Sequence, residues 1–207
     1  LAAEAIDLGR LLLQLMPDEP EGLGLVALML FSAARRQARR DAAGNYVPLS
    51  EQDVGRWSLP LIAEANDLLR RAERQEQLGR YQLEAVIQSL HCARAFTGVT
   101  DWQAIAWVYD ALVTIAPSIG ALVSRAAAQA EAQDAAAGWA ALQAIPADLI
   151  SGYQPYWAVA AHLLTCLQRQ DEAGDAYARA IELAHDPAER RFLAKRAAAL
   201  AGNQGSS

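Results

Sequence analysis

Apolar residues recur at intervals of three and four positions along nearly the whole chain, which is the spacing of one face of an α-helix. In residues 2–16 this stripe consists of Ala5, Leu8, Leu12 and Leu15, and Pro17 ends it. The pattern predicts helices over residues 2–16, 18–37, 53–77, 81–95, 101–116, 118–132, 134–145, 153–169, 171–184 and 187–201. No region has the composition of strands, so the sequence predicts an all-α fold.

The stretch QRQDEAGDAYARAIELA, residues 168–184, indicates how the helices pack. Ala173, Tyr177 and Ala180 lie on one helix face, where two small residues admit a neighbouring helix and one ring wedges against it. The positions 68 residues earlier, twice 34, form a second stripe of this kind: Ile105, Tyr109 and Leu112. A tetratricopeptide unit, which is a pair of antiparallel helices, has about 34 residues. We therefore expect antiparallel helix hairpins stacked as a tetratricopeptide-like right-handed superhelix; coincidence in an alanine-rich chain is the alternative.

The helical period clearly fails in one place, an irregular loop near residues 38–53. Gly44-Asn45 favours a turn, and Pro48 does not suit a helix interior. A short extended piece is predicted for Tyr46, Val47 and Leu49. Loops of this length in a compact domain are usually functional or packed on themselves.

These patterns predict one continuous domain with three parts. Residues 1–80 form an N-terminal helical part with the irregular loop, and residues 81–201 form the repeats. Residues 202–207 are expected to be a disordered tail. The chain begins within a helical pattern, so we expect it to be a fragment of a longer protein.

The composition excludes several classes of protein. The 207 residues carry a formal net charge of −6 and a pI near 5.1, so this chain would repel a phosphate backbone. No apolar run reaches the roughly 20 residues of a membrane span. Cys92 and Cys166 lie in apolar helical patterns, which favours buried free thiols in a reducing cytosol. We therefore expect a cytoplasmic protein that contacts no membrane.

The histidines and cysteines give little support to catalysis. His162 and Cys166 are four apart on one helix face, but two ligands are too few for a metal site. His91 and Cys92 are adjacent and therefore point in different directions on a helix. The sequence has no glycine-rich phosphate loop and no hydrolase motif. We expect no catalytic residue, metal, cofactor or small-molecule substrate; a helical enzyme using His162 and Cys166 is one alternative.

The densest basic cluster consists of Arg35, Arg36, Arg39 and Arg40, just before the irregular loop. Cations at the end of a helix interact favourably with its dipole, which is one interpretation. A docking site for an acidic surface is the other. The sequence leaves both open.

The run GRLLLQLMPDEPEGLGLVALMLFSAARRQARRDAAGNYVPLSEQDVGRW, residues 9–57, resembles a known family. It is similar to the start of a C-terminal extension found in a group of bacterial extracytoplasmic-function (ECF) RNA polymerase sigma factors. Further similar stretches are LIAEA (61–65), GRYQLEAVI (79–87), TDWQAIAWVYDAL (100–112) and AERRFLAKR (188–196). Ser124-Arg125 departs from the family, which often has Asn before that Arg.

The resemblance implies a regulatory, protein-interaction domain that modulates transcription initiation. Its partners would be its own upstream sigma domains and the RNA polymerase core, with promoter DNA contacted only through those upstream domains. A generic cytoplasmic tetratricopeptide adaptor, binding a peptide unrelated to transcription, is the alternative.

We predict two sets of partner-binding residues. The loop set comprises Arg35, Arg36, Arg40, Asp41, Gln52, Asp53, Arg56 and Trp57. The groove set, expected on the concave side of the superhelix, comprises Gln82, His91, Arg94, Ser124, Arg125 and His162.

Overall fold

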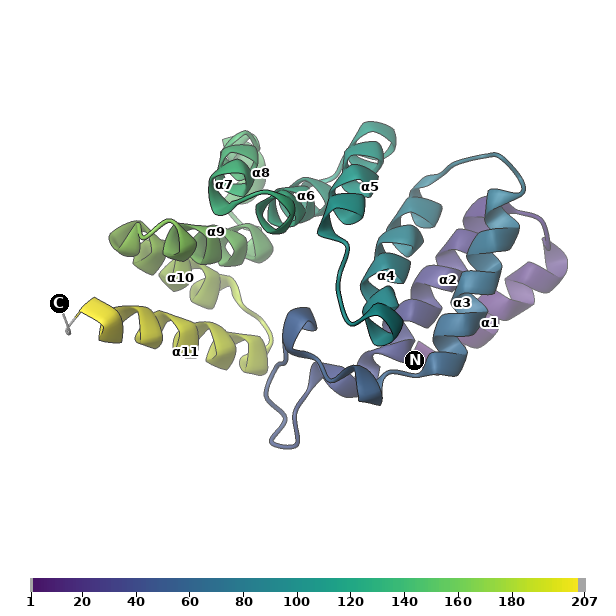
Figure 1. Cartoon of the computed structure of the whole chain (residues 1–207), viewed down its shortest axis with the longest axis horizontal. Coiled ribbons are helices and arrows are strands. Elements are labelled where there is room, and N and C mark those ends of the chain that lie inside the picture. Colours follow the sequence, from purple (N-terminus) through teal and green to yellow (C-terminus); the bar gives the residue numbers. More distant parts are fainter. Residues whose placement is uncertain (1, 205–207) are drawn as a thin grey trace. The chain divides into compact units, whose positions relative to one another are not determined.

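The computed structural model describes residues 2–204, and in this part of the chain all regular structure is helical apart from one isolated bridge pair. The α-helices are α1 (Ala2–Leu15), α2 (Pro20–Ala34), α3 (Leu59–Glu73), α4 (Arg80–Thr97), α5 (Trp102–Ile115), α6 (Ile119–Ala132), α7 (Ala135–Gln143), α8 (Ala147–Ile150), α9 (Gln154–Cys166), α10 (Gln170–Leu183) and α11 (Pro187–Gln204) (Figure 1). Three short 3₁₀ helices are η1 (Arg36–Arg39), η2 (Leu49–Glu51) and η3 (Val54–Arg56). The all-α prediction is confirmed, with neighbouring helices packed as antiparallel pairs.

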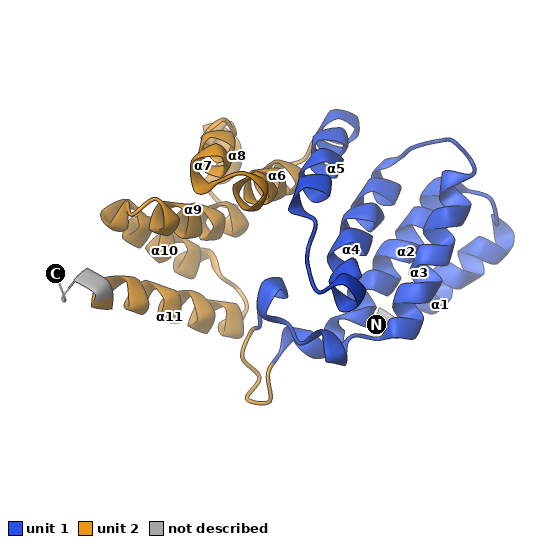
Figure 2. Cartoon of the chain, viewed as in Figure 1, with its two compact units in different colours: residues 1–40, 47–116 blue, residues 41–46, 117–207 orange. Residues whose placement is uncertain are grey.

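The chain forms two compact units (Figure 2). Unit 1 comprises residues 1–40 and 47–116, and unit 2 comprises residues 41–46 and 117–207. The division thus falls after Ala116, whereas the sequence pattern placed a boundary at residue 80 within one continuous domain. The superhelix expected over residues 81–201 would extend across both units and stays a prediction.

Unit 1 is built around α2, which is apolar on nearly all sides. Leu23, Val26, Leu30 and Phe31 are fully buried between the surrounding helices. Helices α3 and α4 both pack directly on α2, and α1 covers a further side. The helix begins with Pro20 at its first position, where the missing N–H costs nothing.

Two features of α2 set its close contact with α4. Both carboxylate oxygens of Glu21 accept hydrogen bonds from the start of α4, one from Tyr81 N at 3.0 Å and one from Gln82 N at 3.2 Å. These amides would otherwise lack partners, because the first turn of a helix has free N–H groups. One turn later, Gly24 lies against the same backbone: a Cβ there would be 2.6 Å from Gln82 N.

Helix α1 is present as predicted, but the apolar stripe identified in the sequence is on the wrong side. Leu8 and Leu15 are 67% and 75% exposed, and Leu12 is 37% exposed. The helix instead buries Ile6 and turns Gly9 toward Val26, whose Cγ2 would be 2.9 Å from an added Cβ. Close packing at the glycine, rather than the leucine spacing, selects the buried face.

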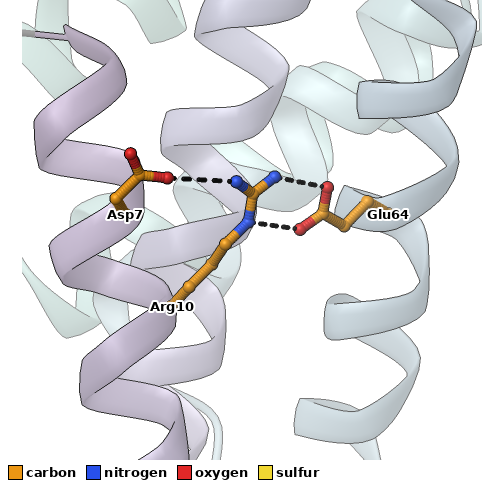
Figure 3. A network of polar contacts seen from close by, with 3 residues as sticks. All are labelled: Asp7, Arg10 and Glu64. Atoms are coloured by element: carbon orange, nitrogen blue, oxygen red, sulfur yellow. Dashed lines mark hydrogen bonds and ion pairs between the residues drawn. The ribbon is translucent and has the colours of Figure 1, made fainter.

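An ion pair also links α1 to α3. The Arg10 guanidinium donates to both carboxylate oxygens of Glu64, at 2.9 and 2.8 Å, and more weakly to Asp7 at 3.3 Å (Figure 3). Because Arg10 and Glu64 are about two-fifths exposed, solvent screens the pair, and we assign it no more than about 1 kcal/mol.

Unit 2 contains the antiparallel pairs α6–α7 and α9–α10. The prediction for residues 168–184 is confirmed at the level of packing: Ala173, Tyr177 and Ala180 are all buried in the core that α9 and α10 share. Gln168 takes a positive φ of 59°, and the turn that it forms ends α9 and starts α10.

The irregular loop is a narrow turn followed by two 3₁₀ helices. Val47 N donates to Arg39 O at 3.0 Å and Asp41 N to Asn45 O at 3.1 Å, so the extended piece predicted here is one isolated bridge. Leu49 starts η2 and is not extended. Helix α3 begins only at Leu59, rather than at residue 53, with Pro60 in its first turn.

The structure describes residues 202–204 of the predicted tail. Residues predicted to be disordered over 202–207 continue α11 as far as Gln204. Residues 205–207 lie outside the described residues. The short helix α8 was also not predicted, because four residues are too few to show a helical period.

Candidate interaction surface

The first feature is Arg94, which holds the irregular loop of unit 1 in place. Its guanidinium, on the last turns of α4, donates to three backbone carbonyls: Ser50 at 2.8 Å, and Leu49 and Gln52 at 2.9 Å each. The same group lies 5.1 Å from the centre of the Trp57 ring. Arg94 therefore uses its donors within the protein, and this favours a positioning role over direct contact with a partner.

Most residues of the predicted loop set also contribute to the structure of the loop. Trp57 is 4% exposed and belongs to the core around α2. Gln52 is buried and donates to Val47 O at 3.3 Å, while Asp53 accepts from Gly55 N at 2.9 Å at the start of η3. Arg56 donates to Arg40 O at 3.0 Å.

Asp41 stabilises the turn of the loop and belongs to unit 2. Its carboxylate accepts from the backbone N–H groups of Ala43 and Asn45 and from the Asn45 side-chain amide, at 2.8 to 2.9 Å. These bonds favour the charged form, and the Asn45 amide is the main cause of a lowered Asp41 pKa. Gly44 takes a φ of 78°, which explains why glycine occupies this turn.

The second feature is a groove of about 570 Å³ in unit 1, which we call the arginine groove. Its residues come from α1, α2, the residue that joins α2 to η1, η1 and α4: Ala5, Ile6, Leu28, Met29, Ser32, Ala33, Arg35, Arg36, Arg39 and Gln88. Its lining includes both apolar residues and three arginines. Arg35 and Arg36 were predicted as partner-binding residues, and the structure brings them together here.

Arg35 is the unusual member, because this residue is only 6% exposed. Its Nη2 donates to Gln88 Oε1, whereas Nη1 is buried and has no hydrogen-bond partner. Burial lowers the pKa of this guanidinium. Arg39 is exposed and donates to Ser32 Oγ at 2.8 Å. The groove therefore contains a buried charge whose hydrogen bonds are incomplete.

The predicted groove set does not lie within one unit. Gln82, His91 and Arg94 belong to unit 1, and Ser124, Arg125 and His162 to unit 2. Gln82 is 5% exposed and donates to Gln77 O at 2.6 Å. Ser124 and Arg125 are half-buried on α6, and His162 is exposed on α9.

Sequence reasoning missed a cavity of about 510 Å³ between α3 and α4. It is lined by Asn66, Leu69, Arg70, Glu73, Glu76, Gln77, Leu78, Gln82, Val86 and Ser89. Inside it, Ser89 Oγ donates to Asn66 Oδ1 at 2.7 Å. Two helices and the segment between them create this cavity, so no single sequence motif could have revealed it.

His162 and Cys166 form a pair, as their spacing predicts. Cys166 Sγ lies 3.9 Å from His162 Nε2. Within residues 2–204, no group of three or more His, Cys, Asp or Glu residues is placed to hold a metal ion. The described helices also include none that is long and apolar enough to cross a membrane.

His91 gives a testable pH dependence. Its ring is buried edge-on against Trp102, with centroids 5.3 Å apart. Burial, together with the charges of Arg35 and Arg94, lowers its pKa to about 4. The unfolded chain, with a histidine pKa of about 6.5, takes up the proton first, so stability falls as the pH drops from about 6.5 to about 4. Between pH 7.5 and 4.5 this group alone should remove about 2 to 3 kcal/mol of unfolding free energy.

Denaturant titrations of the wild type and of His91→Asn at both pH values check this expectation. The variant loses the ring contact with Trp102 and is less stable at pH 7.5, but its loss on acidification should be smaller by about 2 to 3 kcal/mol. Parallel losses in the two proteins would show that His91 does not carry the effect.

The match to a protein family covers α1 to α3 and does not follow the division between the units. A family described as "Family of unknown function (DUF6596)" matches residues 1–73, which include α1, α2, the irregular loop and α3. The matched residues include every residue of the arginine groove except Gln88.

One relative covers nearly the whole chain. "Uncharacterized protein R00370" of Rhizobium meliloti (strain 1021) is 39% identical over 193 residues, which cover 93% of this chain and 45% of that protein. The chain therefore spans less than half the length of this relative. No solved structure matches the chain. Neither the DUF6596 description nor the relative's name mentions a function, and the link to sigma factors stays a prediction.

Proposed function

We propose that this chain is a non-catalytic protein-interaction domain, and that it serves as the C-terminal regulatory extension of an ECF-type RNA polymerase sigma factor. The observation that carries the proposal is the outer face of α1, which we define as Leu8, Leu11, Leu12 and Leu15. These four leucines are between 37% and 75% exposed. Met16, which follows the helix, is 47% exposed.

Leaving such a face in water is costly. Apolar surface contributes about 25 cal/mol per Å² when it is buried, and contiguous exposed patches usually mark binding sites. The residues needed to fix α1 on unit 1, such as Ile6 and Gly9, lie on its other side. The leucines of the outer face are therefore unnecessary for this packing and are available to a partner.

The partner that we propose is the remainder of a longer polypeptide. The related Rhizobium protein is more than twice as long as the matched region, which leaves room for further domains. The resemblance of residues 9–57 to sigma-factor extensions supports upstream domains that read promoters and bind the polymerase core. Contact with these domains, or with the core, would modulate transcription initiation.

A generic tetratricopeptide adaptor is the second candidate, and the antiparallel pair α9–α10 with its buried Ala173, Tyr177 and Ala180 favours it. The reading frame upstream of Leu1 discriminates between the two. Sigma-type helical domains there support the first proposal, and any other type of domain supports the adaptor.

Promoter-dependent transcription with the full-length protein tests the proposal. The double variant Leu8→Glu/Leu15→Glu puts charges on the outer face, and we expect it to change transcription by about tenfold or more, because charged groups cannot replace buried apolar contacts. Gln103→Glu, on an exposed position of α5, is the control and should leave transcription unchanged. Unchanged transcription in the double variant, with its melting temperature preserved, would refute the proposal.

A further inference from the structure

We propose that the arginine groove binds a carboxylate side chain of a peptide segment that also places an apolar residue in the groove. This inference rests on the proposed interaction role and names the chemistry of the partner. It concerns a site for which the sequence left two interpretations open. The arginines could be cations at the end of a helix, or they could form a docking site for an acidic surface.

The buried guanidinium is the first argument. Arg35 lies at the C-terminal end of α2, but as a mere helix-end cation it would be expected to reach solvent. Instead it is 6% exposed, its Nη2 faces only the neutral amide oxygen of Gln88, and its Nη1 has no hydrogen-bond partner. Arg35 is also one of the lining residues, so a carboxylate bound in the groove would supply the counter-charge that the neutral Gln88 amide does not.

The charge of the lining is the second argument. Arg35, Arg36 and Arg39 all line the groove, and the described lining residues include no Asp or Glu. Arg36 and Arg39 are exposed at its rim, where they can attract an anion from solution. The net charge of the whole chain is −6, so this local positive charge is opposite in sign to the net charge of the protein. Such a site is complementary to acidic side chains.

The apolar lining selects a peptide as the source of the carboxylate. Ile6, Leu28 and Met29 line the same groove and can accept an aliphatic side chain. A nucleic-acid backbone has no aliphatic side chain to place against this apolar lining, and the net negative charge of the chain would repel its phosphates. The volume of about 570 Å³ is that of a typical ligand site and can accept a few side chains.

The groove also adjoins the outer face of α1. Ala5 lines the groove, and it lies three residues before Leu8 and therefore beside it on the helix surface. One partner segment can thus cover the leucines with its apolar residues and reach the arginines with an acidic one. An amphipathic segment with apolar and acidic residues has this combination.

Fluorescence anisotropy with the 207-residue chain tests the inference directly. The probe is a fluorescein-labelled peptide of leucine and glutamate residues, and the matched peptide has glutamine in place of every glutamate. We expect the glutamine peptide to bind about tenfold more weakly, because hydrogen bonds to a charged group are stronger than those to a neutral amide. Equal affinity for the two peptides would overturn the inference.

Two double variants locate the site. Arg36→Gln/Arg39→Gln changes two exposed rim arginines and should weaken binding of the glutamate peptide by about tenfold. Arg70→Gln/Arg74→Gln removes the same charge from exposed positions of α3 and its end, outside the groove, and should have little effect. Equal losses in both variants would mean non-specific attraction and would refute a site in the groove.

Competition with free anions distinguishes a carboxylate ligand from a phosphate ligand. At equal ionic strength, free glutamate should displace the peptide at least as well as inorganic phosphate does. Displacement by phosphate alone would overturn the assignment to a carboxylate. These binding measurements do not depend on transcription. If the groove does not bind the peptide but Leu8→Glu/Leu15→Glu still changes transcription, only this inference is refuted. If the groove binds the peptide but Leu8→Glu/Leu15→Glu leaves transcription unchanged, the sigma-factor proposal is refuted instead.

Discussion

Replacing Gly24 with alanine is expected to destabilise unit 1 by about 3 kcal/mol or more, although alanine is the better helix former. The added Cβ would lie 2.6 Å from Gln82 N and 2.9 Å from Tyr81 C. Both atoms are backbone atoms of the first turn of α4, so no side chain can move aside to relieve the contact. The gain in helix propensity is only about 1 kcal/mol, so the steric cost prevails.

The Gly24→Ala substitution should also weaken the cap that Glu21 forms at the start of α4. Pushing α4 away from α2 lengthens the hydrogen bonds that Glu21 accepts from Tyr81 N and Gln82 N. Denaturant unfolding of the wild type and of Gly24→Ala measures the loss. Gly174→Ala on α10 is the matched control, because nothing lies within 4 Å of its added Cβ and the variant should be stabilised by up to about 1 kcal/mol. Stabilisation by both substitutions would show that α2 and α4 are not in close contact at Gly24.

Replacing Arg94 with methionine is expected to cost about 2 to 4 kcal/mol, because three backbone carbonyls lose a charged donor and Trp57 loses its cation–π contact. Methionine keeps most of the apolar stem, so the loss reports on the guanidinium. Arg94→Lys should recover only part of it, since one ammonium group cannot reproduce the planar arrangement of donors.

The local effect of this substitution distinguishes loop positioning from partner binding. Without Arg94, residues 49–57 should become sensitive to protease and the Trp57 fluorescence should change, even without a partner. Arg56→Met is the control, because Arg56 is exposed and donates one hydrogen bond, to Arg40 O, so its loss should cost less than about 1 kcal/mol. An Arg94→Met protein with wild-type stability and an unchanged loop would leave direct partner contact as the role of Arg94.

Hydrophobic periodicity predicted the helices well wherever one face alone is apolar. It selected Ala173, Tyr177 and Ala180 correctly, because the rest of α10 is largely polar. It failed on α1, where leucines occupy much of the outer surface as well. There the buried face is decided by the fit of Gly9 against Val26, which depends on tertiary contact and leaves no periodic signal.

The candidate site shows the same limit. The sequence displayed Arg35, Arg36 and Arg39 as a cluster, but no spacing indicates that one of them is buried with an incomplete set of hydrogen bonds. Arg94 looked like a groove residue because it lies on a helix of the expected repeat. Its actual partners are carbonyls more than 40 residues earlier in the chain, a separation at which sequence patterns carry no information on contact.

The central claim is that a partner covers the outer face of α1, and cysteine labelling tests it most directly. In a Cys166→Ser background, which removes the exposed native thiol, Leu15→Cys and the control Gln103→Cys each report on one surface position. The labelling rates are compared between the 207-residue chain and the full-length protein bound to RNA polymerase core. We predict that Leu15→Cys reacts about tenfold or more slowly in the complex while Gln103→Cys does not change, because a covered thiol must wait for opening. Equal rates at position 15 in both samples would contradict the claim.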